Sequence, residues 1–262
     1  MGCAAVRPVP LTRDATANAT SAARKRPNPI AAAARPGSVR RLSHERGKIA
    51  VMSFSGISDE ALEFYEGLAA DNTKTYWTAH KETYDQLVRG PLVEMCESLA
   101  PEFGSVHLFR PYRDVRFARD KSPYKEQQGA TVGHCYLHIS SSGLFAAVGY
   151  YRMAPDQVTR YREAVDDDRK GAELEKVVSA VRDTGYTVEG DTLKTKPRGY
   201  PADHPRIELL RHRSLVAWTD FGAPDWLATP AAADRVAGAW RDMLPMHDWL
   251  ETNVGPSELP PR

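Results

Sequence analysis

The sequence predicts a single α+β domain in which an antiparallel sheet is packed by several helices. Helical patterns and strand patterns occur in separate runs along the chain, which is typical of an α+β fold and not of a doubly wound one. A second observation is a stretch at residues 127–151 that contains no Asp, Glu, Lys or Arg. Two apolar runs flank a Ser-Gly turn within this stretch, so we expect a β-hairpin near 133–151.

Two helices are expected to open the domain. Ser58, followed directly by acidic residues, predicts the start of the first helix. The second helix is expected to begin at Thr73 and to continue to Leu99. We expect an interruption at Gly90 and Pro91, because proline has no N–H to donate inside a helix.

Strand patterns begin at residue 106. The apolar period changes there to two, which predicts a half-buried strand over 106–117 with a charged face, and Pro111 indicates an edge or a bulge. In chain order the further elements expected are strands at 134–139 and 144–151, helices at 155–165 and 172–181, strands at 186–188 and 192–194, a short helix at 205–211, a strand at 215–218 and a helix at 231–250.

Charge divides the chain into two parts. The 262 residues include 35 Lys and Arg and 34 Asp and Glu, which excludes a histone-like or polyacidic protein. Residues 1–50 carry ten basic and two acidic side chains, a net +8, so the other 212 residues carry −7 of the total of +1. We expect 1–51 to be a disordered basic extension, 52–253 the single globular domain and 254–262 a flexible tail.

The extension has three interpretations. It is a basic arm for nucleic acid, an Arg-rich transit peptide, or the product of a start codon assigned too early. The third interpretation rests on Met52, which stands directly before the first segment of globular character.

Cysteine and hydropathy patterns suggest a cytoplasmic protein. Cys3, Cys96 and Cys135 are odd in number and form no C-x-x-C pair, so neither a disulfide framework nor a cysteine zinc site is supported. The uncharged stretch 127–151 contains glutamines, histidines and a Ser-Gly turn, which a membrane-spanning helix would not place there. No membrane partner is therefore expected.

The common catalytic signatures are absent. The chain contains no G-x-G-x-x-G, G-x-x-x-x-G-K-[ST], G-x-S-x-G or H-E-x-x-H pattern, so we identify neither a catalytic residue nor a cofactor. His134 and His138 share one face of a predicted strand, but four residues of strand span about 13 Å, too far for both imidazoles to bind one ion. We assign no metal site.

Residues 110–125 are the strongest candidate for a site. They include six cations, two carboxylates and two tyrosines, and a turn at Ser122-Pro123 can fold the second half back toward the first. Arginine, lysine and tyrosine side chains together commonly line anion sites. The structural alternative is an ion network, in which Asp114 pairs with Arg110 or Arg116 and Asp120 caps a turn. The candidate ligand-binding residues are Arg113, Asp114, Arg116, Asp120, Lys121, Tyr124 and Lys125.

A second charged segment, residues 193–205, adds three candidates. Pro and Gly punctuate this loop, which contains Arg198, Tyr200 and His204. His204 can move protons near neutral pH. In the structural alternative Asp203 caps the helix that Pro205 begins.

The two segments carry a family resemblance. R-D-V-R-F-A-R-D-K-S-P-Y-K at 113–125 and L-K-T-K-P-R-G-Y-P-A-D-H-P at 193–205 resemble the family called domain of unknown function 2461, found in bacteria and fungi. The resemblance runs from about Phe54 to Leu250. The chain has Asp71-Asn72 and Tyr76-Trp77 where the family has Asn-Asn and Trp-Phe. The resemblance implies one domain over this range and no particular reaction.

Three functions remain open. The first is a protein that binds a small phosphorylated or carboxylated molecule, either as a binding protein or as an enzyme, and it predicts that both charged segments converge on one pocket. The second is a nucleic-acid binder, against which the net charge of −7 on the globular part counts. The third is a structural or partner-binding domain whose charged motif is a buried ion network. The sequence predicts no oligomeric state.

Overall fold

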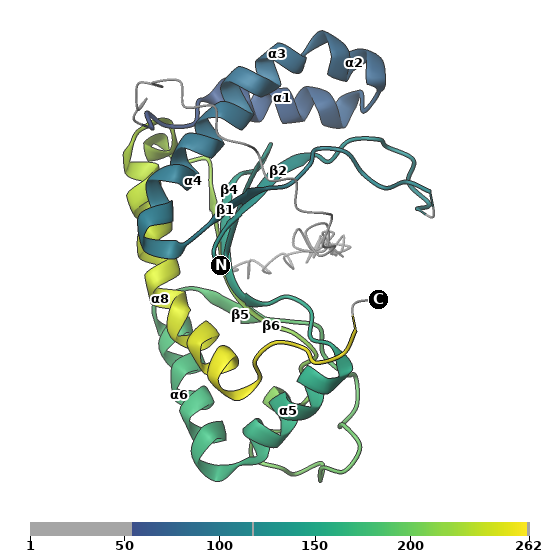
Figure 1. Ribbon diagram of the computed structural model, residues 1–262, viewed down its shortest axis with the longest axis vertical. Helices are drawn as coiled ribbons and strands as arrows, with labels where there is room; N and C mark the ends of the chain where they lie inside the picture. Colours follow the sequence, from purple (N-terminus) through teal and green to yellow (C-terminus); the bar gives the residue numbers. More distant parts are fainter. Residues whose placement is uncertain (1–53, 117, 261–262) are drawn as a thin grey trace, which may run out of the picture.

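A six-stranded antiparallel sheet forms the centre of the structure, a computed structural model that describes residues 54–116 and 118–260 (Figure 1). The strand order is β1-β2-β3-β4-β6-β5. The strands are β1 Val106–Leu108, β2 Gln127–Val132, β3 Cys135–Ser140, β4 Gly143–Tyr150, β5 Thr187–Glu189 and β6 Leu215–Gly222. The α+β prediction is confirmed, and so is the hairpin, which β3 and β4 form. The expected extension 1–51 and the start at Met52 lie outside the described residues.

Helices cover one face of the curved sheet and both of its ends (Figure 1). On the convex side lie α4 Gly90–Phe103, α6 Asp168–Asp183 and α8 Ala231–Asn253. At one end lie α1 Asp59–Ala70, α2 Lys74–Ala79 and α3 Lys81–Thr83, and at the other α5 Pro155–Asp166 and α7 Ile207–Leu210. A π-helical turn, η2 Tyr84–Arg89, precedes α4, and a 3₁₀ turn, η3 Asp225–Ala228, precedes α8. No described helix of the chain is long and apolar enough to cross a membrane.

The two faces of the sheet carry different side chains. Along β3, Leu137 and Ile139 belong to the core between sheet and helices, where they pack with fully buried Trp240 of α8. Tyr136 alternates with them and belongs to a smaller apolar cluster that also contains Phe145. Since successive strand residues point to opposite faces, this second cluster lies on the concave face, away from the helices. The structure thus has a helix-covered core and a second, smaller aromatic cluster on the concave face, in which Tyr136 and Phe145 are themselves buried.

The second predicted helix is divided at a different place. The α2 helix ends at Ala79, with His80 as its C-cap, and the chain then continues through α3 and η2 into α4 without a break at Gly90. The Gly90 N–H bonds to Asp85 O, five residues earlier, so the wide π turn leads the chain past Pro91. Pro91 occupies the first turn of α4, directly after the π-helical turn.

The predicted strand over 106–117 is wrong beyond its first residues. Only Val106–Leu108 pairs with β2, and Phe109 N–H adds one more bond, to Gly129 O at 3.0 Å. The chain then leaves the sheet until Gln127, where β2 begins without having been predicted. Charged residues that alternate with apolar ones produced a strand pattern in a segment that lies outside the sheet. Similarly, the predicted strand at 192–194 forms only the bridge Thr192↔His212.

The C-terminal segment, expected to be a flexible tail, contacts α5. Arg160 donates to Val254 O at 2.6 Å, and Gln157 donates to Gly255 O at 2.8 Å. Asp156 accepts from Ser257 Oγ, also at 2.8 Å. These bonds hold the described part of the segment against the first turns of α5.

Candidate functional site

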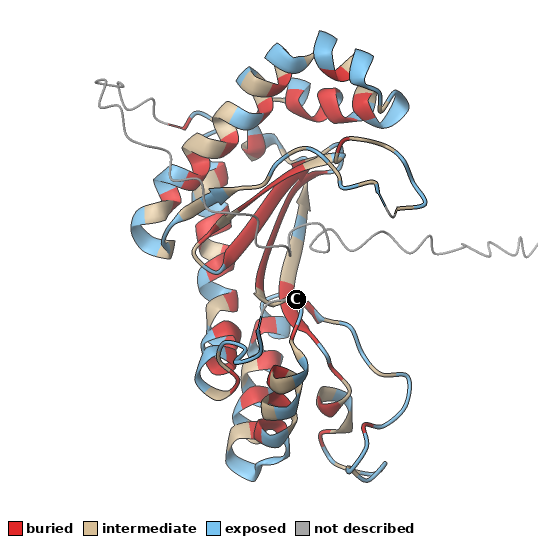
Figure 2. Cartoon of the chain, turned by 45° about the vertical axis from the view of Figure 1, so that its right-hand side comes forward, coloured by how far each residue is buried: buried red, intermediate tan, exposed pale blue. Residues whose placement is uncertain are grey.

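Residues 109–126, here called the arm, leave the sheet between β1 and β2 and project away from it (Figure 1). Tyr112 and Tyr124 form an antiparallel bridge in its stem. Arg113 N–H donates to Pro123 O and Lys125 N–H donates to Pro111 O, each at 2.8 Å. The second half of the motif therefore does fold back onto the first, with the chain reversal over 114–122. Apart from buried Tyr124, the described residues of the arm are exposed or half-buried, whereas the central strands are buried (Figure 2).

The stem is attached to the first helices by an asparagine and an aromatic stack. Asn72, between α1 and α2, donates to Tyr124 O and accepts from Tyr124 N–H, both at 3.1 Å. The Tyr124 ring stacks on Trp77 with centroids 4.3 Å apart and planes 8° apart, and Tyr124 is only 5% exposed. Tyr124 thus anchors the arm to the core and is not available as a surface ligand group.

A buried amide fixes the base of the arm. Gln128 of β2 accepts from Tyr84 Oη at 2.5 Å and donates to Phe109 O at 2.6 Å. Burial raises the pKa of Tyr84 strongly, so the hydroxyl keeps the proton that it donates. The two ends of the arm are therefore held by specific, partly buried hydrogen bonds.

The charged groups at the tip of the arm bond to one another. Arg113 pairs with Asp120 at 2.6 Å, and Arg116 pairs with Asp114 at 2.9 Å. Lys121 donates to Val115 O at 3.0 Å. These pairs are accessible to solvent, with side-chain exposures from 25% for Asp114 to 75% for Arg116, and such pairs stabilise a fold by at most about 1 kcal/mol each. The pairing follows the structural alternative, but the network is not buried as that alternative required.

Asp120 is a poor candidate for a general base. It accepts from Ser122 Oγ at 2.7 Å and from Ser122 N–H at 2.9 Å, so it caps the turn as the structural alternative predicted. These bonds, together with Arg113, lower the pKa of Asp120 to about 2. A carboxylate with so low a pKa has little tendency to take a proton near neutral pH.

Lys125 differs from the cations at the tip. It is half-buried, with Nζ 5.7 Å from the centroid of the Phe109 ring, and it forms no ion pair with any described carboxylate. Burial, and then the nearby charge of Arg110, lower the pKa of Lys125. Two cations therefore lie close together at the base of the arm without a described anion between them.

An aromatic row continues from Phe109 across the concave face. It consists of Phe109, Tyr136, His138, Phe145 and Trp218. Successive ring centroids lie 6.2 Å apart from Phe109 to Tyr136, 6.4 Å from Tyr136 to Phe145 and 5.5 Å from Phe145 to Trp218. Gly129 permits this approach, because a Cβ there would lie 2.9 Å from Tyr136 Oη and 3.3 Å from the Phe109 ring.

His138 contributes an unsatisfied polar atom to this row. Its ring stacks on Phe145, with centroids 4.8 Å apart and planes 23° apart. Burial lowers the pKa of His138 to about 3, so the imidazole is neutral near pH 7. Its Nδ1 is buried and has no hydrogen-bond partner among the described residues, an arrangement that costs about 1 to 3 kcal/mol when nothing binds there.

The second charged segment lies at the other end of the sheet. Figures 1 and 2 both place residues 193–205 beside α5, far from the arm, so the two segments do not converge on one pocket. Arg198 is exposed. Tyr200 is half-buried, with its ring 6.4 Å from that of His204.

His204 is fully engaged by the scaffold. Its Nδ1 accepts from Arg206 N–H at 3.0 Å, and its Nε2 lies 3.1 Å from Asp166 Oδ1. The side chain that accepts from the N–H at the start of α7 is therefore His204, and the prediction that Asp203 caps this helix is wrong. The Arg206 guanidinium, which the sequence did not single out, is buried and donates to Val165 O at 2.7 Å and to Asp166 O at 3.0 Å.

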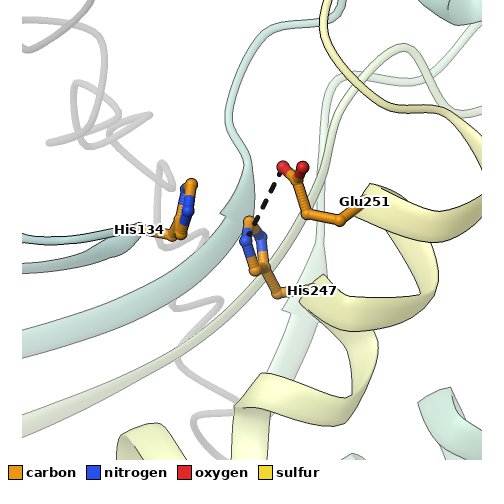
Figure 3. A group of neighbouring side chains, drawn as sticks. All are labelled: His134, His247 and Glu251. Carbon is orange, nitrogen blue, oxygen red and sulfur yellow. Dashed lines mark ion pairs between the residues drawn. The ribbon is translucent and has the colours of Figure 1, made fainter. Parts of the chain in front are cut away.

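His134 and His138 do not share a face. His138 lies on the concave face, whereas His134 lies in the turn between β2 and β3, beside His247 and Glu251 of α8 (Figure 3). The His-x-x-x-Glu spacing of the last two residues places both on one face of a helix. This spacing was the only signal in the sequence for these possible metal ligands. Nothing in the sequence indicates that His134, which is distant along the chain, lies beside them.

Comparison with known proteins gives a family and no activity. A family model described as a conserved hypothetical protein matches residues 60–249, a range that includes the arm, the aromatic row and the second charged segment. Comparison with curated proteins gives no match. The match covers most of the chain and bears out the resemblance found in the two charged segments. The chain belongs to the conserved hypothetical protein family DUF2461.

Proposed function

We propose that the concave face binds a small anionic ligand that carries a planar ring. Lys125 and Arg110 hold the anionic group, and the aromatic row stacks against the ring. The observation that supports this most directly is Lys125, a half-buried cation without a described carboxylate partner, at the end of a row of aromatic side chains.

Electrostatics favour an anion at this place. A partly buried ammonium loses hydration, and a neighbouring guanidinium adds repulsion, so the pair of cations is unfavourable without a counter-charge. The Phe109 ring recovers part of this energy through a cation–π contact. A bound phosphate or carboxylate would recover more through charge-assisted hydrogen bonds.

The aromatic row favours a ring over a bare inorganic anion. Phe109 and Trp218, at the two ends of the row, are half-buried and offer stacking partners for a planar ligand. The free Nδ1 of neutral His138 accepts or donates one hydrogen bond according to its tautomer. Candidate ligands therefore include aromatic carboxylates and mononucleotides, in which a ring, a polar edge and an anionic group occur together.

In this proposal the other predicted residues have supporting roles. Tyr124 anchors the arm, and Arg113, Asp114, Arg116, Asp120 and Lys121 shape its tip through mutual bonds. Arg198, Tyr200 and His204, at the far end of the sheet, do not contact this ligand. The proposal assigns no catalytic residue.

The test is thermal unfolding of the full chain with phosphate, benzoate, nicotinate, AMP and a short single-stranded oligonucleotide. A ligand at 100 times its Kd adds about 2.7 kcal/mol, which raises the Tm of a protein of this size by roughly 5 to 10 °C. We expect this shift for a ring-bearing anion. A shift only with the oligonucleotide, falling steeply with salt, would favour the nucleic-acid alternative instead.

Three variants locate the ligand. Lys125→Met is expected to weaken binding by about 10- to 100-fold, since a hydrogen bond to a charged group contributes roughly 1.5 to 3 kcal/mol. Lys176→Met removes an exposed lysine on α6 and should leave Kd unchanged. Lys121→Met removes a cation at the tip of the arm and so tests whether the ligand binds at the tip or at the base. If Lys121→Met abolished binding while Lys125→Met did not, the ligand would bind at the tip and the proposal would be wrong.

A further inference from the structure

A second group of side chains lies away from the arm and has no role in the proposed ligand site. His134 projects from the exposed turn between β2 and β3, and His247 and Glu251 lie one helical turn apart near the end of α8 (Figure 3). One potential ligand atom from each residue lies within 4.8 Å of the other two. The three side chains converge from two elements that are distant in the sequence.

His247 is the unusual member of this group. The residue is only 4% exposed, and neither of its ring nitrogens has a hydrogen-bond partner within the described part of the chain. Its Nε2 lies 3.7 Å from Glu251 Oε1, which is too long for a hydrogen bond. Because buried imidazole nitrogens are normally satisfied, an unsatisfied ring at the centre of this group suits a cation, which would bind one of the two nitrogens.

The carboxylate in the group is oriented by another side chain. Tyr150, at the end of β4, donates from Oη to Glu251 Oε1 at 2.6 Å. Its ring also packs edge-on against His247, with centroids 5.9 Å apart. Outer groups that orient a ligating carboxylate in this way are typical of metal centres.

We propose that His134, His247 and Glu251 bind a first-row divalent cation of the zinc type. Two imidazoles and one carboxylate are ligands that zinc prefers, and three protein ligands leave a fourth position for water or another ligand. Zinc bonds to nitrogen and oxygen are about 2.0 to 2.2 Å, which places tetrahedral ligand atoms about 3.3 Å apart. The longest of these separations must therefore shrink by up to about 1.5 Å, and His134, exposed on a turn, is the member free to move.

Packing alone explains the geometry less well. The rings of His134 and His247 lie 4.6 Å apart at 34°, a contact that two apolar rings would make equally well. An aromatic pair needs no carboxylate beside it, and it leaves both nitrogens of His247 unsatisfied. A cation accounts for all three residues and for the tyrosine behind Glu251.

The test uses the full chain and two independent readouts. Zinc chloride in excess is expected to raise the Tm by at least about 5 °C. Cobalt chloride is expected to give visible absorption bands of a four- or five-coordinate nitrogen and oxygen site, which do not depend on stability or on any activity. The absence of both the shift and the bands would overturn the proposal.

Variants assign the ligands without removing the buried imidazole. His134→Asn and Glu251→Gln each delete one ligand near the surface and should weaken zinc binding at least tenfold. Tyr150→Phe should weaken it by about tenfold while the cobalt bands remain. His107→Asn, which removes an exposed histidine of β1, is the control and should bind like the parent. Unchanged affinity in both His134→Asn and Glu251→Gln would place any bound metal elsewhere and refute the site.

Discussion

The arm and the segment 193–205 look alike in the sequence, but the structure uses them in opposite ways. Both combine basic side chains with tyrosine and proline. The arm is held through its backbone and one buried ring, and it directs its charged groups to solvent and to the concave face. The second segment and the residues that follow it turn His204 and Arg206 inward onto α5 and α6. Residue type alone therefore does not separate a binding loop from a structural one, whereas the partners of each side chain do.

Removing the ring under the arm should have the largest effect. Trp77→Ala deletes the side chain that stacks on Tyr124 and also contacts Tyr84. A buried tryptophan replaced by alanine typically costs about 3 to 5 kcal/mol, so urea unfolding should show a loss of this size. Trp226→Ala, at a half-buried position beside α8, is the control and should cost clearly less. Equal losses would mean that the stack is not a special anchor.

The corresponding change in the second segment removes a charge from the interior. Arg206→Met keeps most of the side-chain volume but loses the bonds to Val165 O and Asp166 O. We expect a loss of about 2 to 4 kcal/mol in the free energy of unfolding. Arg198→Met, in the same segment but exposed, should change stability by less than about 0.5 kcal/mol. A large loss of stability in Arg198→Met would show that the exposed charge of this segment also stabilises the fold.

The pH dependence of stability tests the environment of His138. Burial lowers the pKa of His138 to about 3 from 6.5, so below pH 6.5 the unfolded chain binds a proton that the folded chain does not. This contribution to stability is complete above pH 6.5 and is lost as the pH falls toward 3, by up to about 1.4 kcal/mol per pH unit. His138→Phe should flatten the curve of Tm against pH below 6.5.

His204→Phe is the matched change in the second segment. It removes the acceptor for Arg206 N–H and the contact with Asp166, so stability at pH 7 should fall by about 1 to 3 kcal/mol. His138→Phe at pH 7 should instead be close to neutral, because the free Nδ1 has no bond to lose. If the two variants behaved alike, the distinction between a satisfied and an unsatisfied histidine would not hold.

The smallest effect is expected at the tip of the arm. Arg116→Met breaks the exposed pair with Asp114 and should cost less than about 1 kcal/mol. The difference from the parent should shrink further at 1 M salt, where the Debye length is about 3 Å. Unfolding curves at low and high salt measure this difference in the free energy of unfolding. A loss of several kcal/mol in Arg116→Met would show that the tip is needed to stabilise the fold.

Local patterns accounted for most of the fold. Helix α1 begins at Asp59, where the acidic first turn predicted it. Helix α2 begins after Thr73, whose side chain accepts from Tyr76 N–H. The hairpin of β3 and β4 follows from its uncharged runs and its turn. These features depend on neighbours in the chain, which is why composition and spacing were sufficient to predict them.

The arm and the sites depend on contacts between distant residues. Asn72 and Tyr124 are 52 positions apart, and no local pattern indicates that the side-chain amide of Asn72 bonds to the backbone of Tyr124. The strand prediction over 106–117 failed because an exposed hairpin and a half-buried strand can show the same alternation. Lys125 was among the candidates from the sequence, but only the structure distinguishes it from the other cations of the arm, by its half-buried position over the Phe109 ring. The aromatic row, assembled from four separate strands and loops, was not predicted.

The two bonds from Asn72 also protect the arm against unwanted association. In an antiparallel bridge such as Tyr112↔Tyr124, the backbone groups of each residue point away from the partner strand. An exposed row of such groups can template the addition of a strand from another molecule, which leads to aggregation. Asn72 occupies both groups of Tyr124, so the chain can project a long, charged hairpin into solvent with that part of its outer edge already closed.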